Sequence, residues 1–422
     1  MYHLSRRTKL LLLKKKLLLL KERHKKRKRT WWVRPAWRNR HNESEFYTSM
    51  KLMRSGDLEY FKKYYRMTPQ QFDSLVSLVR MDLEKEEVCR EPLCPAQRLA
   101  ITLRYLSSGD LVQDIALSFR VGISTARDAI RETCRALWLR LQPIYMKHPD
   151  TTQWAQVCES FQRNWQFPNC LGAVDGKHVK IRAPPNSGSM YFNYKETFSI
   201  VLLAVADGNY KFVVIDVGAY GKQSDGGILR ESVFGKSLDG GKLRIPAPQP
   251  LPGTSCTAPC VFLGDEAFQL RPNFLRPFPG HALDREKRIF NFRLSRARRC
   301  VENAFGIMVS RWRIFQRTIG EHPANAEELV KAACVLHNFL MTPGTQEEQF
   351  YCPPGYGDSI DLQGELCQGQ WREEGLQGAA MPLQRTLCRN FSRAAAEVRD
   401  VYKAYFCSGA GAISLQYKAP GL

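Results

Sequence analysis

Apolar residues recur at helical spacing through residues 57–166 and at strand spacing over much of the chain that follows. Thr68 and Pro69 supply an N-cap and a first-turn proline, and the segment QQFDSLVSLVRM behind them places its apolar residues on one helical face. A second helix is predicted over QRLAITLRYLSS, ending at Gly109. Residues 57–166 are therefore expected to form an all-helical domain.

The block DLVQDIALSFRVGISTARDAIRETCRALWLRL predicts two further helices separated by a short turn. Asp110 is expected to cap the first helix, residues 120–122 to form the turn, and Ser124 to cap the second helix. A helix, a short glycine-containing turn and a second helix are the pattern of a helix-turn-helix, a common DNA-binding unit.

The second of these helices carries an arginine at every fourth residue, at Arg127, Arg131 and Arg135. This spacing places the three side chains on one helical face, where they can contact phosphates or a DNA groove. An ordinary helical hairpin with a solvated arginine face fits the same pattern almost equally well. Both interpretations, DNA-binding residues and solvated surface, stay open at this point.

A different periodicity begins near residue 167, where apolar runs alternate with turn residues. The tripeptide Asp207-Gly208-Asn209 separates two of these runs and is typical of a hairpin. Strands are expected at 171–182, 198–206, 210–217 and 260–264, a short helix after Ser224-Asp225, and long helices at 283–312 and 324–341. Three strands, a helix, a fourth strand and closing helices match the order of a ribonuclease H-like α/β fold.

Composition separates the remaining segments from these two domains. The Pro- and Gly-rich stretch 236–259 is expected to be a surface insertion before the fourth strand, and the Gln-, Gly- and Glu-rich stretch 342–382 a linker. The predicted division is a basic flexible arm at 1–45, the helical domain at 57–166, the ribonuclease H-like domain at 167–341, the linker, and a last helix at 383–406.

Charge is unevenly distributed along the 422 residues, whose formal net charge is +22. Residues 1–40 hold 16 Lys and Arg and a single acid, Glu22, so this arm carries +15 and the rest of the chain 22 minus 15, or +7. Such an arm favours a polyanion partner, nucleic acid above all. A nuclear-import cluster, and hence a nuclear protein with a cytoplasmic pool left open, is predicted from Lys25, Lys26, Arg27, Lys28 and Arg29.

Two other classes of protein are disfavoured by the sequence. Three lysines at 14–16 interrupt the leucine run of the arm, so the run fits neither a signal peptide nor a membrane-spanning helix. The 13 cysteines include no CxxC pair and no histidine pair at zinc-finger spacing, which favours free thiols in a reducing compartment.

Three carboxylates stand on three different predicted elements: Asp175 in the first strand, Asp265 just after the fourth, and Glu302 in the long helix. Converging acidic side chains repel one another unless a hard cation neutralises them, and Mg²⁺ or Mn²⁺ prefers such oxygen ligands. Metal ions held there can activate water and stabilise the leaving oxygen of a phosphodiester. The simpler alternative is that an aspartate after a strand only caps the next turn.

Basic residues crowd the segment between Asp265 and Glu302 and just beyond it. Cations beside a metal-binding carboxylate suit a phosphodiester backbone, which they can hold in place. The alternative, a solvated basic face paired with surface acids, has few acids nearby to support it. Predicted DNA contacts in this segment are Arg293, Arg296, Arg298 and Arg299.

Other polar residues near the carboxylates receive secondary roles. His178 follows Asp175 by three positions, so its side chain should point to the opposite face of the strand, and His178 and Lys177 are interpreted as supporting residues. Asp225 either caps the helix that it begins or adds a fourth carboxylate near the metals. Asp207 is assigned to the hairpin turn.

At the level of motifs, the chain resembles the PIF/Harbinger family of transposases and the transposase-derived nucleases of vertebrates. The resemblance covers about residues 167–340 and rests on the order and spacing of several segments. The proline-rich insertion looks longer than is usual in the family, and the basic arm looks peculiar to this chain. The resembling segments are LGAVDGKHVKIRAP, FSIVLLAVADGNYKFVVIDVGAYGKQSDGGILRES, VFLGDEAF, VENAFGIMVSRWRIF and LHNFL.

What the resemblance implies is specific. It implies a DDE triad of catalytic, metal-binding carboxylates at Asp175, Asp265 and Glu302, with Asp225 matching a further metal ligand, and Mg²⁺ or Mn²⁺ as cofactor. It also implies DNA as the substrate and a separate Myb/SANT-like protein as a partner for specific DNA binding and nuclear import. Homo-oligomerisation is left open.

Two hypotheses follow from the sequence. The first is a metal-dependent DNA endonuclease or transposase-like enzyme that hydrolyses, and in strand transfer exchanges, phosphodiester bonds. The second is a catalytically inactive, domesticated protein that keeps its acids and acts as a DNA-binding or scaffold protein.

Deleting residues 1–40 should weaken DNA binding for all sequences alike and make the plot of log affinity against log salt shallower. Sixteen cations bind DNA largely through counterion release, which is independent of sequence and strongly dependent on salt. The measurement is DNA affinity at several salt concentrations for the full-length and truncated chains. An unchanged slope would place the phosphate contacts elsewhere.

Overall fold

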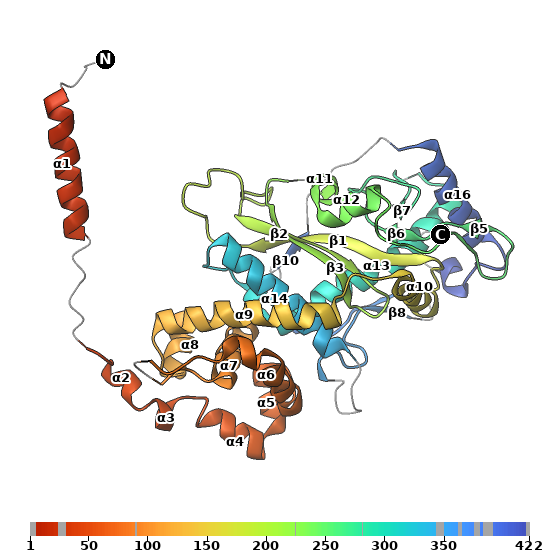
Figure 1. Ribbon diagram of the computed structural model, residues 1–422. Helices are drawn as coiled ribbons and strands as arrows, with labels where there is room; N and C mark the ends of the chain where they lie inside the picture. The colour runs from red at the N-terminus through yellow and green to blue at the C-terminus, as the bar shows by residue number, and fades with distance from the viewer. Residues whose placement is uncertain are drawn as a thin grey trace.

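The computed structural model describes residues 6–23, 31–88, 91–223, 225–280, 282–342, 350–361, 365–374, 380–382 and 391–418. Its N-terminal region is helical and lies beside a second region built around a mixed sheet (Figure 1). The long helix α9 (Ile123–Tyr145) connects the two regions, because it packs both on the N-terminal helices and on α14 (Pro323–Met341) of the second region. The chain is thus a mixed α/β protein with a mostly helical N-terminal part.

The helical region follows the predicted pattern closely. The predicted helix after Thr68 is confirmed as α6, and its start is fixed by a reciprocal cap: Gln71 N donates to Thr68 Oγ1 at 3.2 Å, and Thr68 N donates to Gln71 Oε1 at 2.9 Å. The helices are α4 (Ser49–Gly56), α5 (Leu58–Tyr65), α6 (Pro69–Leu83), α7 (Pro95–Ser108), α8 (Val112–Ser118), α9, and α10 (Thr151–Trp165).

The helix-turn-helix order is present in α8, the turn and α9, but both predicted caps are wrong. α8 begins at Val112 without a side-chain cap, because Asp110 instead pairs with Arg104 at 3.4 Å and Arg317 at 3.9 Å. α9 begins one residue before Ser124 and also lacks a side-chain cap. The turn itself is tight, with Arg120 in the left-handed region at φ 53°.

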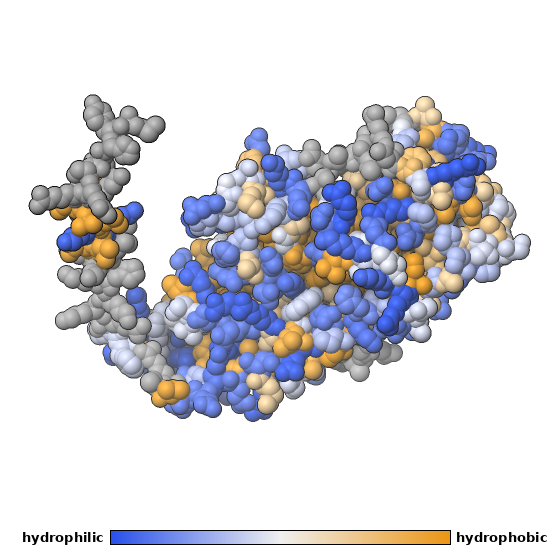
Figure 2. All heavy atoms as spheres, turned by 45° about the horizontal axis from the view of Figure 1, so that its top comes forward, coloured by the Kyte–Doolittle hydropathy of each residue, from blue (hydrophilic) through white to orange (hydrophobic). Residues whose placement is uncertain are grey.

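The N-terminal arm departs from the expectation of a flexible segment, since it contains the helix α1 (Arg6–Arg23) and the short helices α2 (Pro35–Arg38) and α3 (Arg40–Glu43). The described leucines of α1 are 53–66 % exposed, and apolar atoms of this helix face solvent in Figure 2. Among the helices that the structure describes, none is both long and apolar enough to cross a membrane. The predicted import cluster Lys25–Arg29 lies outside the described residues.

The sheet confirms the four predicted strands and their connections. Its order is β3-β2-β1-β6-β7, with β2 antiparallel to both β1 and β3, and β6 parallel to both β1 and β7. The predicted hairpin is also present, because Asp207 Oδ1 accepts hydrogen bonds of 2.8 Å from the backbone of Asn209 and Lys211. The strands are β1 (Cys170–Lys180), β2 (Ser199–Ala206), β3 (Phe212–Tyr220), β6 (Val261–Leu263) and β7 (Phe274–Leu275).

The insertion before the fourth strand is anchored by the end of the chain. After α11 (Asp225–Glu231) and α12 (Val233–Asp239), it forms a small hairpin of β4 (Gln249–Pro250) and β5 (Thr257–Ala258). Tyr402 and Tyr405 of the C-terminal helix α16 (Arg393–Cys407) donate their hydroxyls to backbone oxygens of Pro259 and Pro252, at 2.8 and 3.2 Å. These bonds explain why a stretch rich in proline and glycine keeps a fixed conformation.

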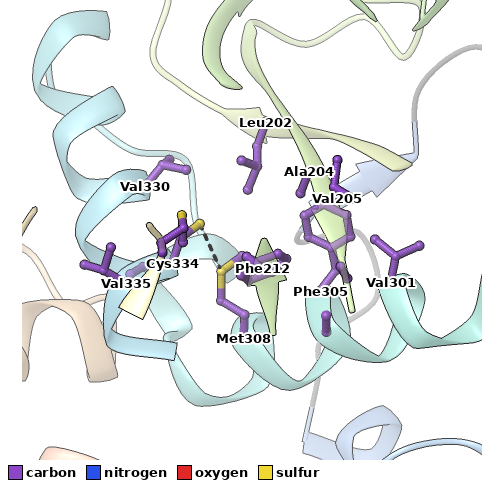
Figure 3. Packing of buried hydrophobic residues seen from close by; sticks show 14 of the residues in the cluster. Leu202, Ala204, Val205, Phe212, Val301, Phe305, Met308, Val330, Cys334 and Val335 are labelled. Atoms are coloured by element: carbon purple, nitrogen blue, oxygen red, sulfur yellow. Dashed lines mark hydrogen bonds between the residues drawn. The ribbon is translucent and has the colours of Figure 1, made fainter. Parts of the chain in front are cut away.

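One face of the sheet is covered by α13 (Arg285–Arg311) and α14. Figure 3 shows this core, where Leu202 and Ala204 of β2 face Phe305 and Met308 of α13. Cys334 of α14 completes the cluster, with its Sγ 3.7 Å from the sulfur of Met308. The covered face is therefore apolar over most of its area.

The predicted linker contains ordered structure. Its described parts include β8 (Ser359–Ile360), β9 (Leu366–Cys367), α15 (Trp371–Glu374) and β10 (Ala380–Pro382), which pairs with β1. Asn303 of α13 exchanges two hydrogen bonds with the backbone of Asp358, at 2.9 and 3.0 Å, and Trp371 covers Gly306 so closely that no side chain would fit there. The segment is a cover over α13.

Lowering the pH from 7 to 5.5 should destabilise the protein through two buried histidines. Burial lowers the pKa of both His178 and His337 to about 4, whereas an unfolded histidine titrates near about 6.5. The unfolded chain therefore binds more protons between these values, so this stabilisation is complete above about pH 6.5 and falls as the pH drops towards 4.

Urea unfolding at several pH values checks this expectation. Each histidine should add a slope of about 1.4 kcal/mol per pH unit within the window. His337 donates from Nε2 to Tyr210 O at 2.8 Å. The variant His337→Gln should therefore be less stable at pH 7, and its free energy of unfolding should depend less steeply on pH, by the contribution of about one proton. An identical slope in the variant would contradict the assignment.

Candidate active site

The sheet register sets β1, which carries Asp175, beside β6, which ends two residues before Asp265. In the parallel ladder between β1 and β6, Ala173 pairs with Leu263, and Asp175 and Asp265 each follow their strand partner by two residues. Side chains two residues apart in a strand point to the same face of the sheet. If this spacing continues beyond the ladder, Asp175 and Asp265 are expected at the same level of adjacent chains and on the same face, with Asp265 two residues past the end of β6.

Their common face is the one that α13 covers. Across the antiparallel ladder, Asp175 pairs with Ala204 and Lys177 with Leu202, and both of these apolar partners face the α13 cluster of Figure 3. Directly opposite partners in a ladder share a face. The Asp175 side chain is thus aimed into the interface between the sheet and α13, where it is 11 % exposed.

Glu302 lies on the helical stripe that meets this face. Arg298 Nη2 lies 4.0 Å from Asp175 Oδ1, and the Lys177 ammonium lies 5.6 Å from the ring centre of Phe305. Arg298, Glu302 and Phe305 follow one another at intervals of four and three residues, so they share one side of α13. Glu302 therefore stands between two residues whose contacts with β1 are fixed.

Each of these acids has protein partners of its own. Asp175 Oδ2 lies 2.7 Å from Lys177 Nζ, and Asp265 Oδ1 accepts a hydrogen bond of 3.0 Å from Ala267 N. The second contact is the turn cap that the simpler sequence interpretation foresaw. Glu302 is half-buried and helps to raise the pKa of Arg372, whose main partner is Asp358 of the covering segment.

The three described members of the predicted metal-ligand set, Asp175, Asp265 and Glu302, are not gathered into one cluster. Within the part of the chain that the structure describes, no three side chains of His, Cys, Asp or Glu are grouped closely enough to hold a metal ion. Asp225 begins α11, as one sequence interpretation had it, but its side chain lies outside the described residues. The physical reason is that the carboxylates pair with nearby cations and backbone groups.

The donor chemistry nevertheless fits a hard cation at two of the positions. Asp175 of β1 and Asp265, just after β6, both carry carboxylate oxygens. Carboxylate oxygen is the ligand type that Mg²⁺ and Mn²⁺ select. Glu302 is one helical turn from Arg298, and Arg298 reaches Asp175. Glu302 therefore lies near Asp175 in the fold, but the three carboxylates do not form one ligand group.

His178 lies on the face of β1 opposite Asp175, as the spacing predicted, and its supporting role stays a prediction. Its ring is buried, with Nδ1 2.9 Å from Ser199 Oγ, and it packs at 5.9 Å from the ring of Tyr194. None of these contacts is shared with Asp175, in agreement with opposite faces of β1. Because burial lowers its pKa to about 4, the ring is neutral near pH 7.

The arginines of α13 require a correction. Arg293, predicted to contact DNA, is only 1 % exposed, and its guanidinium donates to Gln166 O, to Gly411 O at 2.7 Å and to Gln416 Oε1 at 2.9 Å. Arg296 donates to Trp165 O. The helical pattern did not reveal that this side of α13 is covered by the end of α10 and by the C-terminal residues, so Arg293 and Arg296 hold elements together.

Arg298 and Arg299 also lie largely inside the protein. Arg298 is 12 % exposed on its side chain and reaches Asp175, while Arg299 is half-buried with one terminal nitrogen buried and without a hydrogen-bond partner among the described residues. Neither forms the exposed basic stripe that the sequence predicted. Of the two, Arg298 is the one with a recorded contact to a candidate carboxylate, Asp175.

The arginines of α9 are exposed, as predicted. Arg127 lies 3.4 Å from Glu321 and Arg131 lies 3.0 Å from Asp128, whereas Arg135 forms no ion pair with any described residue. Asp128 and Glu132 stand on the same helix, so its surface has mixed charge. The solvated-surface interpretation therefore accounts for Arg127 and Arg131 at least as well as DNA binding.

A cleft lies beside the turn before α9. It encloses about 830 Å³ and is lined by aromatic and basic residues, among them Trp32, Trp37, Arg38 and Arg120. Sequence analysis missed this feature, because the tryptophans precede the predicted helical domain. The signal that could have revealed it is the tryptophan pair at residues 31 and 32 next to the basic arm.

Lys177 and Arg372 were also missed as direct partners of the acids. The spacing of Asp175 and Lys177 by two residues in a strand could have shown that they share a face. Nothing in the sequence connects Arg372 with Glu302, since 70 residues separate them and only the folded cover brings them near one another.

Comparisons with known proteins agree with the family resemblance of the motifs. Residues 174–338 match the family model described as DDE superfamily endonuclease. Arabidopsis thaliana "Protein ALP1-like" is 25 % identical over 68 % of this chain and 72 % of its own length, and human "Putative nuclease HARBI1" is 22 % identical over 68 % and 78 %. No solved structure matches the chain. The resemblance that the motifs indicated is thereby confirmed.

Replacing Arg293 with Met should destabilise the fold by about 3 kcal/mol or more, because three buried acceptors would lose their donor. Replacing the exposed Arg135 with Met should leave stability within about 0.5 kcal/mol of the wild type. Urea unfolding of both variants is the measurement. A stable Arg293→Met protein with weakened DNA binding would restore the sequence interpretation.

Proposed function

We propose that the protein is a divalent-metal-dependent DNA endonuclease of transposase ancestry, since residues 174–338 match the family model described as DDE superfamily endonuclease. The observation that supports the proposal is the parallel pairing of β1, which carries Asp175, with β6, which ends two residues before Asp265, beside the α13 helix that carries Glu302. We propose a ribonuclease H-like fold for this domain, supported by the strand order β3-β2-β1-β6-β7 and the helix that follows.

The cofactor in this proposal is Mg²⁺ or Mn²⁺, held by Asp175 and Asp265 with Glu302 as the further ligand and Asp225 as a candidate fourth. Bound there, the metal would activate a water and stabilise the leaving oxygen of a phosphodiester. The chain contributes the rest of the site. Arg298 offers a cation beside Asp175, and Arg372 of the cover over α13 carries a charge that interacts with Glu302.

DNA is the proposed substrate. The basic arm, Arg135, and the aromatic and basic cleft beside α9 support this, since cations bind phosphates and aromatic rings stack on bases. A nuclear location through Lys25–Arg29 and a Myb/SANT-like partner remain proposals that rest on the sequence alone.

One observation favours a second candidate function. The Asp175 carboxylate is occupied by Lys177 at 2.7 Å and approached by Arg298, which is the arrangement of a structural ion pair. A protein whose carboxylates form structural ion pairs and bind no metal would act as a DNA-binding or scaffold protein. This alternative predicts DNA binding without cleavage.

Replacing Asp265 with Asn should lower the rate of Mg²⁺-dependent cleavage of duplex DNA by about 100-fold or more, because even the outer partners of metal sites cost about 10- to 100-fold. The matched control is Glu266→Gln, which removes the adjacent carboxylate and should leave the rate unchanged. The assay compares cleavage by the two variants and the wild type at equal DNA occupancy. Cleavage by all three at one rate would count against an active site at Asp265, and DNA binding without cleavage by any of them would favour the scaffold function.

A further inference from the structure

The Asp175 carboxylate has a cation at each oxygen. Lys177 Nζ lies 2.7 Å from Oδ2 and Arg298 Nη2 lies 4.0 Å from Oδ1, while the three side chains are only 11–15 % exposed. A unit positive charge so close to a ligand oxygen repels a divalent ion that approaches the same oxygen. The strength of metal binding at Asp175 thus depends on where these two cations are.

We propose that Lys177 is a built-in competitor for the divalent metal, and that a DNA phosphate, by attracting the Lys177 ammonium, allows the metal to bind Asp175. This inference rests on the proposed function and specifies its regulation. In this scheme metal binding and DNA binding strengthen one another: DNA draws Lys177 away from Asp175, and a metal ion at Asp175 leaves Lys177 free to bind a phosphate.

Lys177 is better suited to this role than Arg298. A lysine carries a compact charge on a flexible stem of four carbons, and Nζ already lies 5.6 Å from the Phe305 ring, whose face can hold a cation displaced from Asp175. Arg298 is more constrained, since its Nε is buried without a hydrogen-bond partner among the described residues. Its longer contact of 4.0 Å also leaves Oδ1 less engaged.

Charge balance supports the exchange. With Lys177 and Arg298 beside it, the Asp175 carboxylate is already neutralised, so a divalent ion would add excess positive charge. The phosphates of DNA bring the compensating negative charge to the same face. Lys177 moving from carboxylate to phosphate keeps one cation next to one anion throughout, which avoids leaving a nearly buried charge unpaired.

Mn²⁺ titration of the full-length protein, followed by the electron paramagnetic resonance signal of free Mn²⁺, tests the proposal without requiring cleavage. Without DNA, Lys177→Met should bind Mn²⁺ at least about tenfold more tightly than the wild type, because a competing unit charge is gone. The control is Lys180→Met, which removes a lysine of the same strand and should leave the affinity unchanged. Lys177→Gln serves as a second variant should the methionine fail to fold.

The same titration in the presence of a 20-base-pair duplex measures the coupling. DNA should tighten Mn²⁺ binding by the wild type and by Lys180→Met, and have a much smaller effect on Lys177→Met. Asp175→Asn sets the baseline and should bind Mn²⁺ far more weakly than the wild type under both conditions.

The outcomes separate the two proposals. If Asp175→Asn weakens Mn²⁺ binding while Lys177→Met matches the wild type, the metal site stands and the competitor role of Lys177 is overturned. If Asp175→Asn binds Mn²⁺ as well as the wild type, the metal site at Asp175 and the proposed nuclease fail together. Equal coupling to DNA in the wild type and Lys177→Met would also overturn the exchange.

Discussion

The packing of α13 across β1 is the constraint on which the rest of the structure depends. Its apolar residues, Phe305 and Met308 among them, fill the space above β2, and this burial fixes the rotation of the helix about its axis. That rotation decides that Arg298 reaches Asp175 and that Glu302 stands one turn further along the same side. If α13 were rotated by a third of a turn, Glu302 would face another part of the protein and Arg298 would no longer reach Asp175.

The cost of this arrangement is electrostatic. α13 carries many arginines, and several of them are drawn into the interior, where burial lowers the pKa of Arg293 to about 9. A buried guanidinium is tolerated only when acceptors surround it, and the carbonyls of Gln166 and Gly411 supply them. The end of α10 and the C-terminal residues are thereby tied to α13, so residues that look like DNA contacts in the sequence instead fix the position of α13.

The segments outside the sheet serve the same helix from its other side. Asn303 hydrogen-bonds to Asp358, and Gly306 packs against Trp371, in the described parts of the cover at 355–361 and 365–374. The C-terminal helix α16 holds the proline-rich insertion through the hydroxyls of two tyrosines. These regions have little apolar periodicity of their own, and they are ordered because they satisfy groups on α13 and near β6. The site thus sits in a frame that includes parts of the chain far from the family domain.

By itself, the sequence determined the helices of residues 57–166, the four strands, the hairpin at Asp207 and the long helices, because periodicity, caps and turn residues are local properties. It also selected Asp175, Asp265 and Glu302. The tertiary structure alone decided which charges meet. It paired Asp175 with Lys177, buried Arg293, ordered the predicted linker and left the caps at Asp110 and Ser124 unused. Sequence spacing gives the face on which a side chain lies, but its neighbours come from packing between elements distant along the chain. The strength of a charge or a cap depends on those neighbours and on how much water they exclude.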